Sequence, residues 1–118
     1  LQFASAVVVS TVVPVAEELI FRGALYNAVQ PRAAEVEPGR RREIVPFAVT
    51  ALAFASVHLL AGFETVAAIV QIVILSSFLS GLRAVTGSVK PSIVAHLVWN
   101  LTAALGLIVS TSLNLPGT

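Results

Sequence analysis

The chain has 118 residues, of which 57% are hydrophobic and only 11% are charged, and its formal net charge is +1. A soluble domain is typically about 45–50% apolar and about 25% charged, so this chain has too few polar side chains to cover a soluble fold. The same numbers exclude disorder and give no basic footprint for nucleic acid, and the absence of cysteine excludes a disulfide scaffold. A protein embedded in a membrane remains.

The first predicted element is a transmembrane helix over residues 3–29. About 20 apolar residues cross a bilayer as a helix, and this stretch is interrupted only by Glu17, Glu18 and Arg22. Residues 30–43 follow, with seven charged side chains, two prolines and Gly39. That composition predicts a polar loop.

Three further apolar runs predict transmembrane helices over 44–62, 65–83 and 91–113. Their short connections contain Gly62 and Gly87, and Pro91 suits the first turn of a helix. Runs such as residues 69–82 lack the alternation of a membrane β-barrel. We therefore expect an all-α, polytopic transmembrane bundle of about four helices, forming one membrane-embedded domain over residues 1–118.

The number of basic residues alternates between high and low from one connection to the next. The positive-inside rule places the first and third connections in the cytoplasm, so residues 30–43 are predicted to be a cytoplasmic loop and the first helix to run from outside to inside. The first stretch lacks the basic start of a signal peptide, and the chain lacks an initiator Met. We expect a fragment of a longer protein with further helices upstream. The basic residues that set this pattern are Arg32, Arg40, Arg41 and Arg42 in the first connection, none in the second, and Arg83 and Lys90 in the third.

Ionisable side chains inside a bilayer are costly and usually mark function. Glu18 and Arg22 are four residues apart on one helix face, so they can form a structural ion pair. Glu17 points about 100° away and remains available for chemistry. A buried network of all three charges that only holds helices together is the alternative.

The other strongly polar groups of the predicted helices are His58, His96 and Asn100, with Gln71 interpreted as a packing or pore-side residue. A carboxylate and a neutral imidazole can deprotonate a water, and a second His with an Asn can donate hydrogen bonds to an oxyanion. This set predicts hydrolysis of an acyl or peptide bond. Without Asp or Cys, the chain cannot build a Cys protease, an aspartyl dyad or a Ser-His-Asp triad.

Two alternatives use the same residues. Glu17, His58 and His96 form a His₂Glu set, which binds catalytic zinc in other proteins, although no HExxH motif supports it here. A relay of Glu and His could also carry protons in a transporter. Helix rise from the predicted helix ends places Glu17 about 18 Å, His58 about 21 Å and His96 about 8 Å deep, so either the ends or the tilts must differ from this scheme.

At these residues the sequence resembles the CAAX protease and bacteriocin-processing (CPBP, or Abi) family of intramembrane endopeptidases. The family pattern EExxxR, FxxxH and HxxxN appears in order as EELIFR, FASVH and HLVWN. The resemblance implies that Glu17 and His58 activate water and that His96 and Asn100 stabilise the oxyanion. Phe54 would pack beside the site, and Glu18 with Arg22 would support Glu17.

The resemblance also bears on cofactor and substrate. The family was named for metalloprotease activity, but a metal-free, glutamate-based mechanism has been argued for it, and we favour no cofactor, with a divalent metal such as zinc as the alternative. The expected partners are the lipid bilayer and a membrane-associated peptide or protein substrate. An Arg-rich, Lys-poor composition suggests a bacterial plasma membrane. A non-catalytic scaffold or bacteriocin self-immunity protein with the same fold is the alternative function.

Overall fold

The computed structural model describes residues 2–36, 41–62 and 65–113, and these residues form helices joined by short connections, without a strand. This confirms the all-α prediction. The helices are α1 (Gln2–Glu18), the π-helix η1 (Leu19–Leu25), α2 (Tyr26–Val36), α3 (Arg41–Leu60), α4 (Val66–Thr86) and α5 (Lys90–Leu113).

Within the described ranges, four helical segments are long and apolar enough to cross a membrane, as the sequence predicts. The first combines α1, η1 and the start of α2 into one continuous rod, and the others are α3, α4 and α5. Only 11% of the most apolar window of α5 is buried inside the molecule. Such an exposed apolar face needs lipid or other helices around it.

The prediction of a loop over residues 30–43 was wrong in its extent. Helix α2 continues to Val36 and α3 begins at Arg41, so most of this polar segment is helical. The alanines and the glutamate of residues 33–35 favour helix, and charged side chains at the end of a membrane helix are compatible with helical backbone in water. Residues 37–40 lie outside the described part of the chain.

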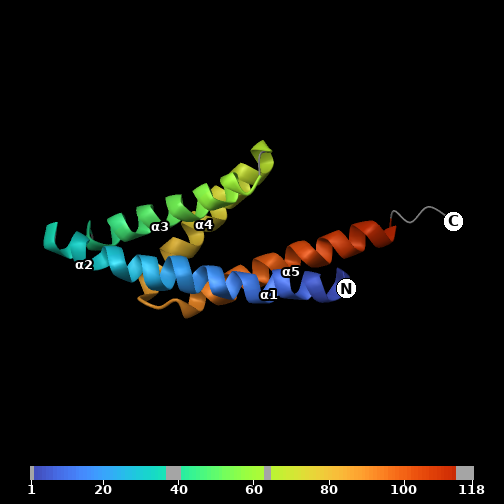
Figure 1. The fold of residues 1–118 in the computed structure, drawn as a ribbon, viewed down its shortest axis with the longest axis horizontal. Helices are drawn as coiled ribbons and strands as arrows, with labels where there is room; N and C mark the ends of the chain where they lie inside the picture. Colours follow the sequence, from blue (N-terminus) through green and yellow to red (C-terminus); the bar gives the residue numbers. More distant parts are fainter. Residues whose placement is uncertain (1, 37–40, 63–64, 114–118) are drawn as a thin grey trace.

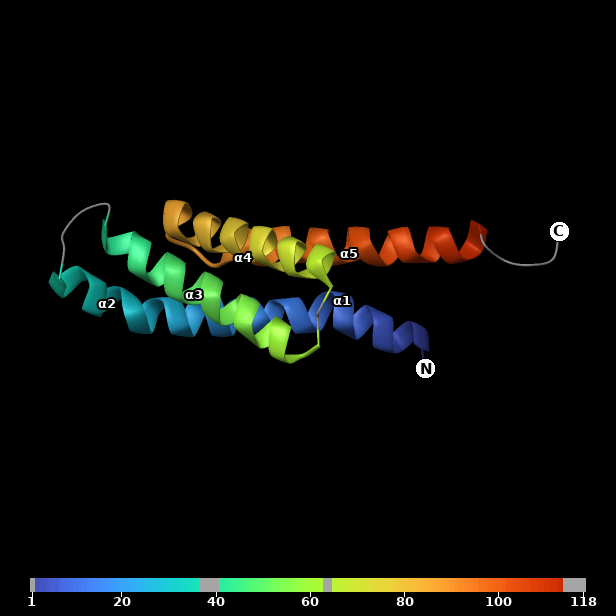
Figure 2. The ribbon, with the colours of Figure 1, turned by 90° about the horizontal axis from the view of Figure 1, so that it is seen from above.

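The helices form two layers that diverge. In Figure 1, α1 and α5 run together in one layer, and the α3–α4 pair leaves them at an angle toward the end at which α1 begins and α5 ends. Figure 2 shows α3 above α1 and α4 above α5. The layers therefore meet at one end and open like a V at the other.

The helices of this bundle do not end at one common level. This explains why the predicted depths of Glu17, His58 and His96 disagree. Figure 2 shows the end of α2 and the start of α3 projecting beyond the connection between α4 and α5. Residues counted from those two ends therefore start from different levels. Depths counted from these different ends are therefore not comparable, and the side chains of Glu17, His58 and His96 meet at one level, with both imidazole Nε2 atoms 3.7 Å from the Glu17 carboxylate.

Small polar side chains join α3 to α4 within their layer. Thr50 Oγ1 lies 3.1 Å from Ser80 Oγ, and Ser76 Oγ donates to the carbonyl of Ala51 at 2.8 Å. Thr50, Ser76 and Ser80 are fully buried or nearly so. Small residues allow close approach of membrane helices, and their hydroxyls add hydrogen bonds where water is absent.

The connection between α4 and α5 is a tight turn with specific capping. Gly87 has φ +69° and its N–H donates to the carbonyl of Arg83, which ends α4. A left-handed residue after a helix is usually glycine because a Cβ is disfavoured there. The Oγ of Ser88 then accepts from Lys90 N–H at the start of α5. This turn fixes how the helix that carries His96 leaves α4.

Candidate active site

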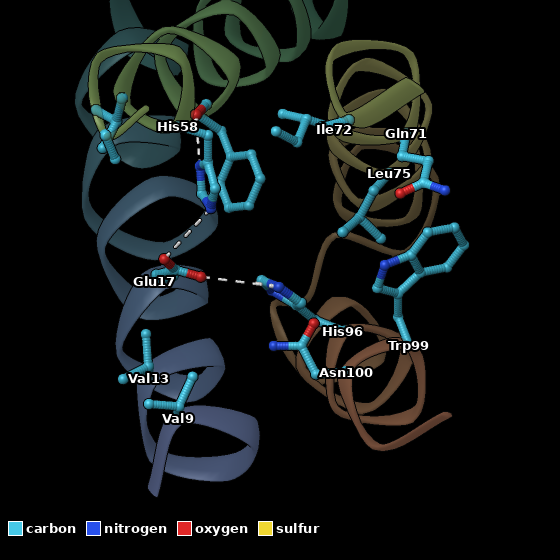
Figure 3. Close-up of a pocket in the computed structure, with 14 residues that line it drawn as sticks. Val9, Val13, Glu17, His58, Gln71, Ile72, Leu75, His96, Trp99 and Asn100 are labelled. Carbon is cyan, nitrogen blue, oxygen red and sulfur yellow. Dashed lines mark hydrogen bonds and ion pairs between the residues drawn. The ribbon is translucent and has the colours of Figure 1, made fainter. Parts of the chain in front are cut away.

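Three of the predicted site residues meet across the opening of the V, each from a different helix. Glu17 comes from α1, His58 from α3 and His96 from α5 (Figure 3). His58 Nε2 lies 3.7 Å from Glu17 Oε1, and His96 Nε2 lies 3.7 Å from Glu17 Oε2. The two imidazoles thus face different oxygens of one carboxylate, at a separation too long for a direct hydrogen bond but suited to a bridging water.

Glu18 and Arg22 form the expected ion pair, and it is fully buried. Arg22 Nη1 donates to Glu18 Oε1 at 3.0 Å. The same oxygen lies 2.9 Å from His96 Nδ1. Arg22 Nη2 also donates to the carbonyl of Ser76 at 3.0 Å and to its hydroxyl at 3.3 Å. The pair therefore connects α4 to α5 through the helix that carries Glu17.

The hydrogen bonds of the two imidazoles orient them toward Glu17. His58 Nδ1 lies 2.9 Å from the carbonyl oxygen of Phe54, which can only accept, so this nitrogen carries a proton. His96 Nδ1 faces the Glu18 carboxylate in the same way. A partner on Nδ1 fixes the orientation of each ring, so both rings direct Nε2 toward Glu17.

Phe54 packs beside the site and contacts most of its charged and aromatic groups. Its ring is 1% exposed, stacks on His58 with centroids 4.2 Å apart, and meets His96 edge-on at 5.7 Å. The guanidinium carbon of Arg22 lies 4.5 Å from the centroid of the Phe54 ring. Phe21 packs against the same ring at 5.3 Å. One phenyl ring thereby fixes both imidazoles and excludes water from the ion pair.

A cleft of about 440 Å³ opens from Glu17 between the two layers. Asn100, one turn after His96 on α5, lines this cleft. Gln71 from α4 and Trp99 from α5 line it as well (Figure 3). The described residues offer no hydrogen-bond partner to the side chains of Asn100 or Gln71. The remaining walls are largely apolar and include Val9, Val13, Val57, Ala61, Ile72 and Leu75.

Sequence reasoning missed Arg83, which it used only as a cytoplasmic cation. The side chain is 8% exposed, and its Nε donates to the carbonyl of Arg22 at 3.0 Å. A signal was present in the sequence, because Ser76, Ser80 and Arg83 form a polar stripe on one face of an apolar helix. Because Arg83 is buried, it no longer counts as a cytoplasmic surface cation. The orientation of the chain in the membrane then has less support from basic residues and stays a prediction.

The predicted His₂Glu metal set meets a geometric difficulty. Among the described residues, no group of three His, Cys, Asp or Glu is arranged closely enough to hold a metal ion. In Figure 3, His58 and His96 approach the Glu17 carboxylate from different directions, and each faces a different oxygen. The side chains as they stand do not fit a tetrahedral zinc site.

Comparison with known proteins adds an independent observation. A family model described as Rce1-like, type II CAAX prenyl endopeptidase Rce1-like, matches residues 1–102. No curated protein and no solved structure matches the chain. The matched range contains every residue of the site described above. With four membrane-spanning helices and a match over most of its length, the chain is an integral membrane protein that belongs to the Rce1-like family of type II CAAX prenyl endopeptidases, which is a protease family.

Proposed function

We propose that this protein is an intramembrane endopeptidase that hydrolyses peptide bonds with a water activated by Glu17 and His58. The observation that carries the proposal is the position of the Glu17 carboxylate, which is 24% exposed to the cleft and has an imidazole Nε2 at 3.7 Å from each oxygen. Family membership supports peptidase activity in general.

In this mechanism a water lies between Glu17 and His58 Nε2, both of which can accept its proton. The water oxygen attacks the carbonyl carbon of the scissile peptide and forms a tetrahedral intermediate. The C–N bond then breaks, and the proton taken from water passes to the leaving amine. Glu17 is suited to both transfers because its two oxygens reach either side of the site.

His96 and Asn100 would stabilise the oxyanion of that intermediate. The Nδ1 proton of His96 is used by Glu18, so His96 donates into the cleft only when Nε2 is protonated as well. Carboxylates on both sides balance the positive charge of that form. The Asn100 amide supplies a neutral donor one turn away, and each such donor contributes about 2.7–4 kcal/mol in known oxyanion holes.

The walls of the cleft support a proposal for the substrate class. They are mainly aliphatic, and the few polar groups are Glu17, His58, His96, Asn100, Gln71 and Trp99. An apolar peptide segment or lipidated chain end fits such a cleft, whereas a charged soluble peptide would lose hydration there. A membrane-associated peptide or protein is therefore the proposed substrate.

The test measures cleavage of a peptide library by the purified protein in liposomes. Glu17→Gln and His58→Ala should each lower kcat by about 100-fold or more, because general-base catalysis typically contributes 10²–10⁴-fold. Lys90→Gln, which removes an exposed charge outside the cleft, is the control and should leave kcat unchanged. Unchanged cleavage by both cleft variants would refute the proposal.

A second candidate is a scaffold or self-immunity protein with the same fold. It predicts that Glu17→Gln keeps the biological phenotype, while substitutions that disturb helix packing, such as Ser80→Leu, abolish it. Metal dependence is tested separately by measuring bound zinc in the purified protein and the effect of a chelator on cleavage.

A further inference from the structure

Arg83 is a buried cation that the proposed reaction does not use. Its Nη2 donates to Asn27 Oδ1 at 2.7 Å, in addition to the 3.0 Å bond from Nε to the carbonyl of Arg22. Its guanidinium carbon lies 4.5 Å from the centroid of the Tyr26 ring. All three contacts are to the first transmembrane segment, around the end of η1. A side chain held this closely has a defined position rather than a role as a mobile surface charge.

The π-helical turn explains why the carbonyl of Arg22 can accept from a side chain. In an α-helix, the N–H of Tyr26 would donate to the carbonyl of Arg22, four residues earlier. Here the Tyr26 N–H instead donates to the carbonyls of Phe21 and Gly23. Arg83 takes up the carbonyl that this irregular turn leaves accessible. Single π turns of this kind are frequent at functional sites.

Helix α4 thus binds Arg22 at two points. Ser76 accepts from the guanidinium, and Arg83 donates to the main chain of the same residue. Ser76 and Arg83 are seven residues apart, which places them on one face of α4, two turns from each other. The two contacts together fix both the position and the direction of the Arg22 side chain.

Hydrogen bonds continue from Arg22 to the cleft. Arg22 Nη1 binds Glu18 Oε1, and that oxygen binds His96 Nδ1. Glu18 and Arg22 are 0% exposed and His96 is 2% exposed, so water does not compete for these contacts. A change in the position of the Arg22 backbone would therefore be passed to the imidazole that faces Glu17.

We propose that Arg83 is a positioning residue for this site: by binding the Arg22 carbonyl, to which Tyr26 N–H does not donate, it sets the geometry of the Arg22–Glu18–His96 chain. This inference rests on the proposed peptidase function for its kinetic consequence, but its structural consequence is separate. It predicts that loss of Arg83 disturbs His96 and leaves His58, which is oriented by the Phe54 carbonyl on α3, in place.

The test compares Arg83→Gln and Arg83→Lys with Arg42→Gln, a control that removes an exposed arginine from α3. Two readouts are taken on the purified full-length protein in liposomes: kcat and KM for a cleaved peptide, and the ¹⁵N signals of histidine side chains, with those of His58 assigned by His58→Gln. A misplaced catalytic group costs about 10- to 100-fold in rate, so Arg83→Gln should lower kcat by that factor with KM nearly unchanged.

The imidazole signals of His96 should shift in Arg83→Gln while those of His58 stay. Arg83→Lys keeps a donor for one of the two partners and should restore part of kcat, and Arg42→Gln should match the wild type in both readouts. Unchanged His96 signals, or equal shifts of both histidines, would overturn the inference. If the wild type cleaves no peptide, the proposed function fails, and the histidine signals still decide whether Arg83 positions His96.

Discussion

His96 and Glu18 make a buried contact, with His96 Nδ1 2.9 Å from Glu18 Oε1, although they are 78 residues apart in sequence. The carboxylate oxygen that receives this imidazole also receives Arg22. Two cationic or donor groups therefore depend on one atom. The contact makes Glu18, which does not face the cleft, a determinant of how His96 faces Glu17.

Glu18→Gln should destabilise the protein and disturb the site together. The substitution leaves the buried Arg22 without its countercharge, and breaking a buried ion pair typically costs about 3–5 kcal/mol. Thermal unfolding in detergent, followed by tryptophan fluorescence from the single Trp99, measures the loss. Glu43→Gln is the same substitution at a carboxylate that accepts from Tyr26 Oη and Gln30 Nε2 but forms no ion pair with Arg22. It should cost less, and an equal cost would contradict this account.

Phe54→Ala should be among the most destabilising aliphatic or aromatic truncations in the chain. The ring is buried against two imidazoles, a guanidinium and Phe21, and removal of a buried phenyl ring typically costs about 3–5 kcal/mol. Phe54→Leu keeps most of the volume but loses the stacking and should cost less. Phe78→Ala on the exposed face of α4 is the control for denaturation in detergent.

Replacing each of two glycines by alanine should change the free energy of unfolding in opposite directions. Gly87 ends α4 with φ +69°, so Gly87→Ala should destabilise by about 1 kcal/mol because L side chains are disfavoured in that conformation. Gly106 lies inside α5, and a Cβ there meets no atom within 4 Å. Gly106→Ala should therefore stabilise by about 0.5–1 kcal/mol through helix propensity. Denaturant midpoints of both variants check the pair, and the same sign for both would refute it.

Gln71→Leu should separate binding from stability. Gln71 lines the cleft from α4, and its amide makes no hydrogen bond within the described residues, so the fold loses nothing when it is replaced. A peptide in the cleft would lose a polar partner, and KM should rise with little change in kcat. Steady-state kinetics alongside thermal unfolding measure both effects. A large fall in unfolding temperature would show instead that Gln71 has a structural role.

The helices could be predicted from the sequence to within a few residues at most ends, because membrane spans are defined by the length of apolar runs. The π turn of η1 could not. In an almost uniformly apolar helix, no polar stripe marks the helical period. One extra residue in a turn therefore leaves no sign in the sequence. The helical ends of residues 30–43 were missed because charge and proline were given more weight than the helix propensity of the alanines between them.

The polar residues that line the cleft or support it could be singled out from the sequence because each motif places its polar groups on one helix face, as with Glu18 and Arg22. Which oxygen meets which imidazole depends on packing between helices and was not accessible. Arg83 shows the limit most clearly. A cation at the end of an apolar run looks the same in sequence whether it faces water or the interior, and only its partners in the fold tell the two apart.

Helix α1 extends past the end of the α3–α4 pair (Figure 1), so its first turns lie beyond the contact between Glu17 and His58. The helix extends about 20 Å from Glu17 to Ala4, so a tilt of only 10° would move its far end by about 3 Å while the carboxylate stays close to the imidazoles. The width of the entrance and the alignment of the reactive groups are therefore separable quantities. Chains of different width can enter between these helices without displacing Glu17 from His58 and His96.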